Sequence, residues 1–294
     1  MARLPIVCCL FLLAGCHPSA SVATYALPAR DTPAAERHIL RLPPRPADAL
    51  TGSAFIDRAV SMRPGEREHA IVAEILSGNV PEFERKLLPV DLQAKDREGN
   101  QLRGRIFVLP DYLAIGSDDD FVRFPMTVRN ARKIARETGT VLPTPHIVDV
   151  IHAAAAARIA SPYKTPGDAM ASAEYFRDHN RTIEERRKKH GHVLGTLLSG
   201  PKKDLVISIR MLETPRRTPI YGWFNDDGTV IQTLSLLHDD HYVDYAHGIR
   251  LVDAEMEVAG KPAHLLDVLA TRAKAPLISN EGFYDLRFVW EKGW

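Results

Sequence analysis

The chain has three cysteines, and all of them lie within the first sixteen residues: Cys8, Cys9 and Cys16. Everything after Cys16 must therefore fold without a disulfide bond, a thiolate metal site or a cysteine nucleophile. A body without such crosslinks depends on an apolar core, and the 294-residue chain, at 45% hydrophobic and 26% charged residues, has the composition of a globular protein that contains one. These observations exclude cysteine peptidase chemistry.

An apolar run near the N-terminus is typical of a signal peptide. It extends from Leu4 to Leu13 after an early basic residue, Arg3, and is too short to span a membrane, because a spanning helix needs ~20 apolar residues. The run ends in LAGC, residues 13–16, which resembles the bacterial lipobox. The resemblance implies cleavage before Cys16 and lipidation of its thiol. The alternative is an ordinary secretory peptide with an incidental cysteine.

The residue after the cysteine indicates where such a lipoprotein is anchored. In lipoproteins generally, aspartate at this position favours the inner membrane, and here the residue is His17. The resemblance therefore implies a lipid anchor at Cys16 in the outer membrane, with the body in the periplasm. The formal net charge is +1, so we expect no nucleic-acid partner.

The composition predicts three segments: a signal peptide over 1–15, a tether over 16–50 and a single folded domain over 51–294. The tether prediction depends on six prolines and little hydrophobic periodicity, which is typical of a semi-extended segment. These prolines are Pro18, Pro28, Pro33, Pro43, Pro44 and Pro46. No internal repeat and no second domain boundary is evident.

Helical patterns dominate the first half of the domain. Apolar spacing predicts a helix over 65–76 that stops at Gly78. Two longer helices are predicted to begin at Thr144-Pro145 and Thr165-Pro166, with threonine as the N-cap and proline in the first turn. The first is expected to reach Ile159.

Strand patterns dominate the second half. An early hairpin is predicted around Arg97–Asn100, and Asp227-Gly228 marks another between two alternating runs. Further strands are expected over 205–211, 249–252, 255–261 and 284–290, with a short helix over 264–271. The predicted fold class is therefore α+β, with helices mainly in the first half and a mostly antiparallel sheet in the second.

A serine and three aspartates follow the apolar run YLAIG, in the order Ser117, Asp118, Asp119, Asp120. A Gly-Ser strand end can expose a nucleophile, and clustered carboxylates can bind a hard cation. The spacing matches neither a calcium loop nor a GxSxG elbow. A polar turn is the alternative, and in either case Arg123 is a plausible partner for one of the aspartates.

Two lysines stand directly before another apolar run, at Lys202 and Lys203. A lysine at this point can bind an anionic group of a substrate, or act as a base if burial lowers its pKa. Charged residues at a turn before a strand are the alternative.

The stretch HDDHYVDYAHGIRLV, residues 238–252, holds the densest group of candidate residues. Neither a helix nor a strand directs His241, Asp244 and His247 at one ion without a bend, so HxxDxxH is not a recognised zinc signature. We expect His247 to be the acid–base residue or a ligand, because Gly248 lets a substrate approach, and Asp244 to orient it. A hydrogen-bonded polar strand end is the alternative.

Three stretches within residues 105–252 together resemble a family of secreted bacterial proteins of uncharacterised activity: DYLAIGSDDDFVRFPMT, LLSGPKKDLVIS and IYGWF with HYVDYAHGIRLV. We expect a lipid-anchored envelope protein that acts as a hydrolase on peptidoglycan or another envelope substrate; a non-catalytic ligand- or partner-binding envelope lipoprotein is the alternative. No cofactor or metal is identifiable. The candidate catalytic residues are His247, Asp244, His238, Ser117 and Asp118, and the candidate substrate-binding residues are Lys203, Arg250, Trp223, Tyr242 and Arg123.

Overall fold

The computed structural model describes residues 38–292 of the chain. The predicted signal peptide, the lipobox with Cys16 and most of the predicted tether lie outside these residues. All described residues belong to one unit of mutual contacts. Within this part of the chain, no helix is long and apolar enough to cross a membrane.

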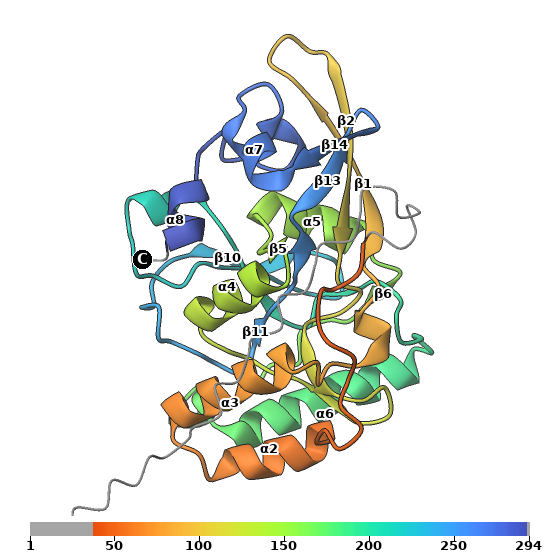
Figure 1. Cartoon of the computed structure of the whole chain (residues 1–294), viewed down its shortest axis with the longest axis vertical. Coiled ribbons are helices and arrows are strands. Elements are labelled where there is room, and N and C mark those ends of the chain that lie inside the picture. Colours follow the sequence, from red (N-terminus) through yellow and green to blue (C-terminus); the bar gives the residue numbers. More distant parts are fainter. Residues whose placement is uncertain (1–37, 293–294) are drawn as a thin grey trace, which may run out of the picture. The chain divides into compact units, whose positions relative to one another are not determined.

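Most helices of the described residues come before residue 190. They are α2 (Gly52–Val60), α3 (Pro64–Leu76), α4 (Val128–Glu137), α5 (Pro145–Ala154) and α6 (Ala173–Lys189), with α7 (Leu265–Ala270) and α8 (Arg287–Lys292) near the C-terminus. Short 3-10 turns occupy Glu82–Glu84, Asp168–Ala171, Ile209–Leu212 and Ala275–Leu277. Helices α2, α3 and α6 lie together at the lower end of Figure 1, where Arg67 of α3 packs over the ring of Phe176 of α6.

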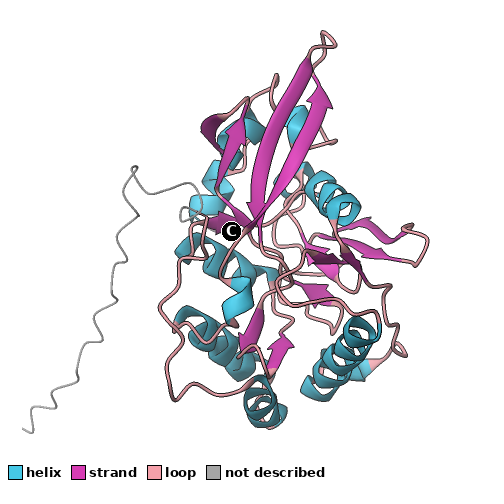
Figure 2. Ribbon diagram, turned by 90° about the vertical axis from the view of Figure 1, so that its right-hand side faces the viewer, coloured by secondary structure: helices cyan, strands magenta, loops and turns pink. Residues whose placement is uncertain are grey.

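The body also contains two larger sheets (Figure 2). The six-stranded sheet has the order β14 (Lys261–His264), β13 (Glu255–Val258), β2 (Gln101–Val108), β12 (Val252–Asp253) and β5 (Thr140–Val141), with β1 (Leu88–Lys95) also paired to β2. The four-stranded sheet has the order β10 (Val230–Ser235), β9 (Ile220–Phe224), β8 (Lys203–Leu205) and β11 (His247–Gly248). Two further pairs are β3 (Ala114–Gly116) with β4 (Phe121–Arg123) and β6 (Ala157–Arg158) with β7 (Leu198–Ser199).

Pairing is mostly antiparallel, as predicted. Among the described strands, only β8–β11 and β6–β7 pair in parallel. The α+β class is therefore confirmed, and so are the two predicted hairpins, β1–β2 and β9–β10. The helix that stops at Gly78 is also confirmed, since α3 ends at Leu76 and Gly78 has a φ of +91°.

Several element predictions are wrong, and in three of them a local cap or pairing overrides the apolar pattern. Helix α5 ends at Ala154, since β6 then pairs with β7. Helix α6 begins after Ser172, whose side chain accepts a hydrogen bond from Tyr175 N, and not after Thr165. The terminal run is helical and not a strand, because Asp285 accepts a hydrogen bond from Arg287 N at the start of α8.

The segment before residue 51, which was assigned to the tether, packs on the body from residue 38 onward. His38 Nδ1 lies 2.7 Å from Asp253 Oδ2. The Arg45 guanidinium donates to Asn79 Oδ1 and to the Gly116 carbonyl, both at 3.0 Å. This segment therefore contributes to the fold.

A substitution at Gly78 tests whether residues 43–44 of the N-terminal segment pack on the body. A methyl group at Gly78 would collide with the carbonyl oxygen of Pro43 and lie 2.9 Å from that of Pro44, whereas Gly99 has a similar φ of +87° and open space around it. We expect Gly78→Ala to lower the free energy of unfolding by about 1–3 kcal/mol more than Gly99→Ala, measured in urea. Equal losses would show that residues 43–44 do not pack there.

Candidate functional site

A tight turn joins the two residues that the sequence paired, Asp244 and His247. Residues 242–244 are in neither helix nor strand. The Asp244 carboxylate accepts a hydrogen bond from Ala246 N at 2.7 Å, and the Asp244 carbonyl accepts one from His247 N at 3.1 Å. This Asx-type turn brings Asp244 Oδ2 to 4.0 Å from His247 Nε2.

Two consecutive lysines hold this turn. Lys203 pairs with His247 across the parallel strands β8 and β11, and its Nζ donates to Asp244 Oδ2 at 3.1 Å. Lys202 Nζ donates to the carbonyls of Tyr245 and His247 at 3.0 and 3.3 Å. Lys202 directly precedes β8, whereas Lys203 is its first residue. The turn is therefore held through its backbone and through its carboxylate.

Burial sets the charge of each group. His247 is fully buried, which lowers its pKa to about 4 against the attraction of Asp244. Burial also lowers the pKa of Lys202 to about 7. Burial by itself would raise the pKa of Asp244, but the adjacent His247 and Lys203 outweigh it and that pKa is lowered. At neutral pH the site thus holds a neutral imidazole beside an ionised carboxylate.

Aromatic rings cover this pair. Tyr242 donates to Asp244 Oδ2 at 3.3 Å and presents its ring to His247 at 5.6 Å between centroids. His238 stacks on Tyr242 at 3.7 Å. On the other side, Lys203 Nζ lies 4.8 Å from the Trp223 ring centroid. The structure therefore brings six of the predicted residues together: His247, Asp244, His238, Lys203, Tyr242 and Trp223.

Ser117 and Asp118 lie in the turn between β3 and β4. Asp120 N donates to Ser117 Oγ at 3.3 Å, and Phe83 N donates to Asp118 Oδ1 at 3.2 Å. No hydrogen bond or ion pair of the described residues joins either side chain to His247. These contacts are those of the polar turn that was the alternative for this stretch.

Arg123 does not pair with any of residues 118–120, and that prediction is wrong. It is 1% exposed and forms two hydrogen bonds with the Asp111 carboxylate, at 2.8 and 2.7 Å, and a third with Glu184 at 2.8 Å. Arg250 is also fully buried, and it donates to the carbonyls of Leu109 and Leu198. Both guanidinium groups hold the core together and neither faces solvent.

Gly248 has a structural role that the sequence did not indicate. A methyl group there would collide with the Tyr112 ring and lie 2.8 Å from Lys202 Cβ. The space next to Gly248, through which a substrate was expected to approach, is therefore occupied by the ring of Tyr112. The phenol of Tyr112 donates to Asp204 Oδ2 at 3.3 Å, and burial raises the pKa of Asp204 to about 7.

Sequence reasoning gave Lys202 no role separate from that of Lys203 and missed Asp111. In the sequence, Lys202 and Asp111 are recognisable only as polar residues next to an apolar run, and polar residues of exposed turns occur in the same setting. The ring of His179 is buried on α6, and both of its ring nitrogens lack a hydrogen-bond partner among the described residues.

No group of three His, Cys, Asp or Glu side chains among residues 38–292 has a geometry that could hold a metal ion. The exposed ring of His241 lies 3.2 Å from Arg129 Nη1 and 3.8 Å from Asp240 Oδ1, and no hydrogen bond or ion pair among the described residues joins it to Asp244 or His247. The HxxDxxH spacing thus does not bring its three side chains together.

Comparisons with protein-family models, with curated proteins and with solved structures found no match for this chain. A neutral imidazole can accept a proton, an adjacent carboxylate can stabilise the imidazolium that forms, and an ammonium can stabilise a developing negative charge.

The buried state of His247 predicts a pH dependence of stability. The unfolded imidazole binds a proton below about pH 6.5, whereas the folded one does so only below about pH 4. Protonation between these values favours the unfolded state. The contribution of neutral His247 to the free energy of unfolding is therefore fully present above about pH 6.5 and decreases as the pH falls. Relative to His247→Phe, we expect the wild type to lose about 3 kcal/mol of unfolding free energy over this range, measured in urea. Parallel pH curves for the two proteins would contradict this.

Proposed function

We propose that the chain is a lipid-anchored hydrolase of the bacterial cell envelope, acting on peptidoglycan or another envelope polymer. The anchor would be Cys16, and the active site would be formed by His247, Asp244 and Lys203. One observation carries the catalytic part: both ring nitrogens of His247 lack a hydrogen-bond partner among the described residues, although an ionised carboxylate lies 4.0 Å away. An imidazole held neutral and unbonded is available to accept a proton.

The proposed step is attack of water on a carbonyl or glycosidic carbon. His247 takes the proton of the attacking water and later returns it to the leaving group, so the proton is conserved. Asp244 stabilises the imidazolium between these transfers. Lys203, which donates to Asp244 at 3.1 Å, supplies positive charge for the oxygen on which negative charge develops.

A substrate can reach His247 only if the neighbouring rings of Tyr242 and His238 move. The His247 ring has no exposed surface, whereas Tyr242 and His238 above it are half-buried. Tyr163 is 61% exposed and meets Trp223 edge to face at 5.0 Å. Displacement of Tyr242 would open a path to His247 beside this aromatic pair, on which a sugar or peptide can stack.

A non-catalytic ligand-binding lipoprotein is the second candidate. The complete burial of His247 and the Lys203–Asp244 ion pair favour it, because a closed, paired site can serve recognition as well as chemistry. In that case Tyr163, Trp223 and Lys203 would form the recognition surface. The two candidates differ in whether His247 is needed for product formation.

Muropeptide release from purified sacculi separates the two candidates. We expect the wild type to release soluble fragments and His247→Ala to reduce the rate by at least ~100-fold, since general acid–base residues contribute about that much. His241→Ala is the matched control, because His241 is exposed and lies away from the turn. Equal release by wild type and His247→Ala, or none by either, would overturn the peptidoglycan proposal.

A further inference from the structure

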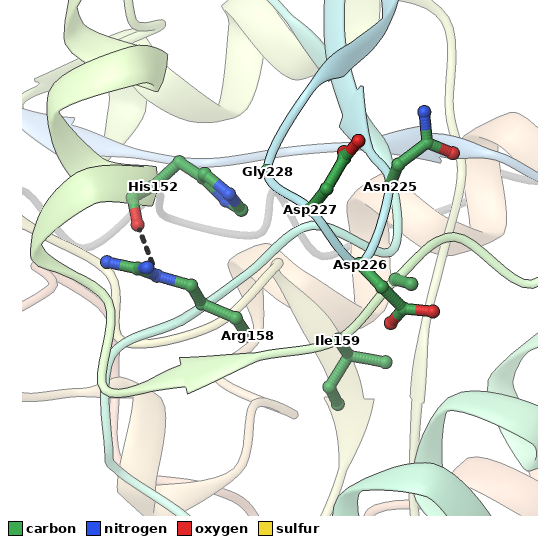
Figure 3. A pocket seen from close by; sticks show the side chains of 8 residues that line it. His152, Arg158, Ile159, Asn225, Asp226, Asp227 and Gly228 are labelled. Carbon is green, nitrogen blue, oxygen red and sulfur yellow. Dashed lines mark hydrogen bonds between the residues drawn. The ribbon is translucent and has the colours of Figure 1, made fainter.

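A small polar pocket lies between the end of α5 and the turn that joins β9 to β10 (Figure 3). His152, Arg158 and Ile159 line one side, and residues 225–228 line the other. Its volume of about 100 Å³ is enough for several waters or for one aminomethyl-sized group. None of its lining residues belongs to the His247 site.

His152 gives this pocket an unused hydrogen-bonding atom. The residue is 8% exposed, its ring stacks on Phe224 at 3.7 Å, and its Nδ1 lies 3.2 Å from Ser199 Oγ. Its Nε2 is buried and has no partner among the described residues. Figure 3 shows the ring directed at the turn of residues 226–228, and a methyl group at Gly228 would lie 3.8 Å from Nε2.

The protonation state of His152 makes this atom an acceptor. Burial, with a smaller effect of Arg158, lowers the His152 pKa to about 4, so the ring is neutral at pH 7. When Nδ1 carries the hydrogen and donates it to Ser199 Oγ, Nε2 directs a lone pair at the turn of residues 226–228 that lines the pocket. A buried acceptor without a donor is costly, and a ligand with N–H groups removes that cost.

The charges around the pocket favour a cation. Asp226 and Asp227 are exposed at its rim, and the hydrogen bond from the Thr229 hydroxyl lowers the Asp227 pKa. The Arg158 guanidinium is engaged elsewhere, at the C-terminal end of α5: it donates to the His152 carbonyl at 3.0 Å (Figure 3) and to the Ala153 carbonyl at 2.5 Å. The pocket thus has two negative carboxylates and one positive guanidinium, and that guanidinium interacts with the C-terminal end of the helix.

We propose that this pocket binds a primary ammonium group, such as the amine of a lysine or another diamino-acid side chain. His152 Nε2 accepts one of its three N–H groups, and the carboxylates of Asp226 and Asp227 supply the opposite charge. This site goes beyond the proposed hydrolase. Consecutive residues of β9 separate the two, because Phe224 stacks on His152 whereas Trp223 lies against Lys203.

The test is a titration of the ¹⁵N-labelled full chain with n-butylammonium, followed by NMR of the His152 ring nitrogens and the Gly228 amide. We expect a saturable shift at both reporters. Tetramethylammonium has the same charge but no N–H donor, and acetate has the opposite charge, so neither should reproduce it. Binding measured here is independent of any hydrolytic activity, and its failure leaves the His247 proposal unaffected.

Three variants sharpen the titration. Asp226→Asn should weaken binding about tenfold, since it removes one charge at an exposed position without disturbing the core. His152→Phe keeps a ring against Phe224 and should abolish the shift at Gly228. Asp168→Asn removes an equally exposed carboxylate elsewhere and should leave binding unchanged. No saturable shift, or equal shifts with tetramethylammonium or acetate, would overturn the proposal.

Discussion

The candidate site depends on two consecutive lysines whose ammonium groups hold one turn. Lys203 is paired with the Asp244 carboxylate, whereas Lys202 binds backbone carbonyls. Removing one partner of a buried ion pair leaves an uncompensated charge, which typically costs about 3–5 kcal/mol. The turn, strand β8 and strand β11 therefore form together, and the separation of Asp244 from His247 is a consequence of that assembly. The fold therefore determines the geometry of the Asp244–His247 pair.

The buried polar groups divide into two classes. The buried guanidinium and ammonium groups donate either to carboxylates, as Arg123 does to Asp111 and Glu184, or to backbone carbonyls, as Lys202 does. The buried imidazoles of His152, His179 and His247 instead keep at least one ring nitrogen without a partner among the described residues. Burial lowers the pKa of all three. Histidine can be buried without a counter-charge because it becomes neutral, which arginine does not do. Buried atoms without a hydrogen-bond partner also occur on Glu84, Ser161 and Arg250, but among the three histidines the ring is neutral at pH 7.

Much of the fold was predictable because its signals are local. A stop at Gly78, an N-cap at Thr144 and a turn at Asp227-Gly228 each depend on residues a few positions apart, and the structure has all three. The run 205–211 was misassigned because β8 ends at Leu205 and Ser208 then caps a 3-10 turn. Apolarity alone does not distinguish a strand from a short helical turn in a buried segment.

The candidate site was partly predictable for the same reason. Asp244 and His247 are three residues apart, so a turn can join them, and Lys203 was suspected from its place before a strand. The separation of Ser117 from this group was not predictable, because it depends on which strands pair. Asp111 and Glu184 are also far apart in the sequence, and only the folded chain brings both carboxylates to Arg123.

Strand β9 carries a backbone distortion at the point where the two proposed sites meet. Trp223 has a φ of +63° directly after Gly222 at +97°, and a left-handed conformation at a bulky residue costs on the order of 1–2 kcal/mol. The Trp223 indole donates to the Pro201 carbonyl at 3.2 Å and its ring faces Lys203, which offsets that cost. A regular strand would release the strain and remove the ring from Lys203. Backbone strain of this kind persists where it places a side chain that a regular strand would direct elsewhere. At Trp223 it places the indole ring beside Lys203, at the edge of the His247 site.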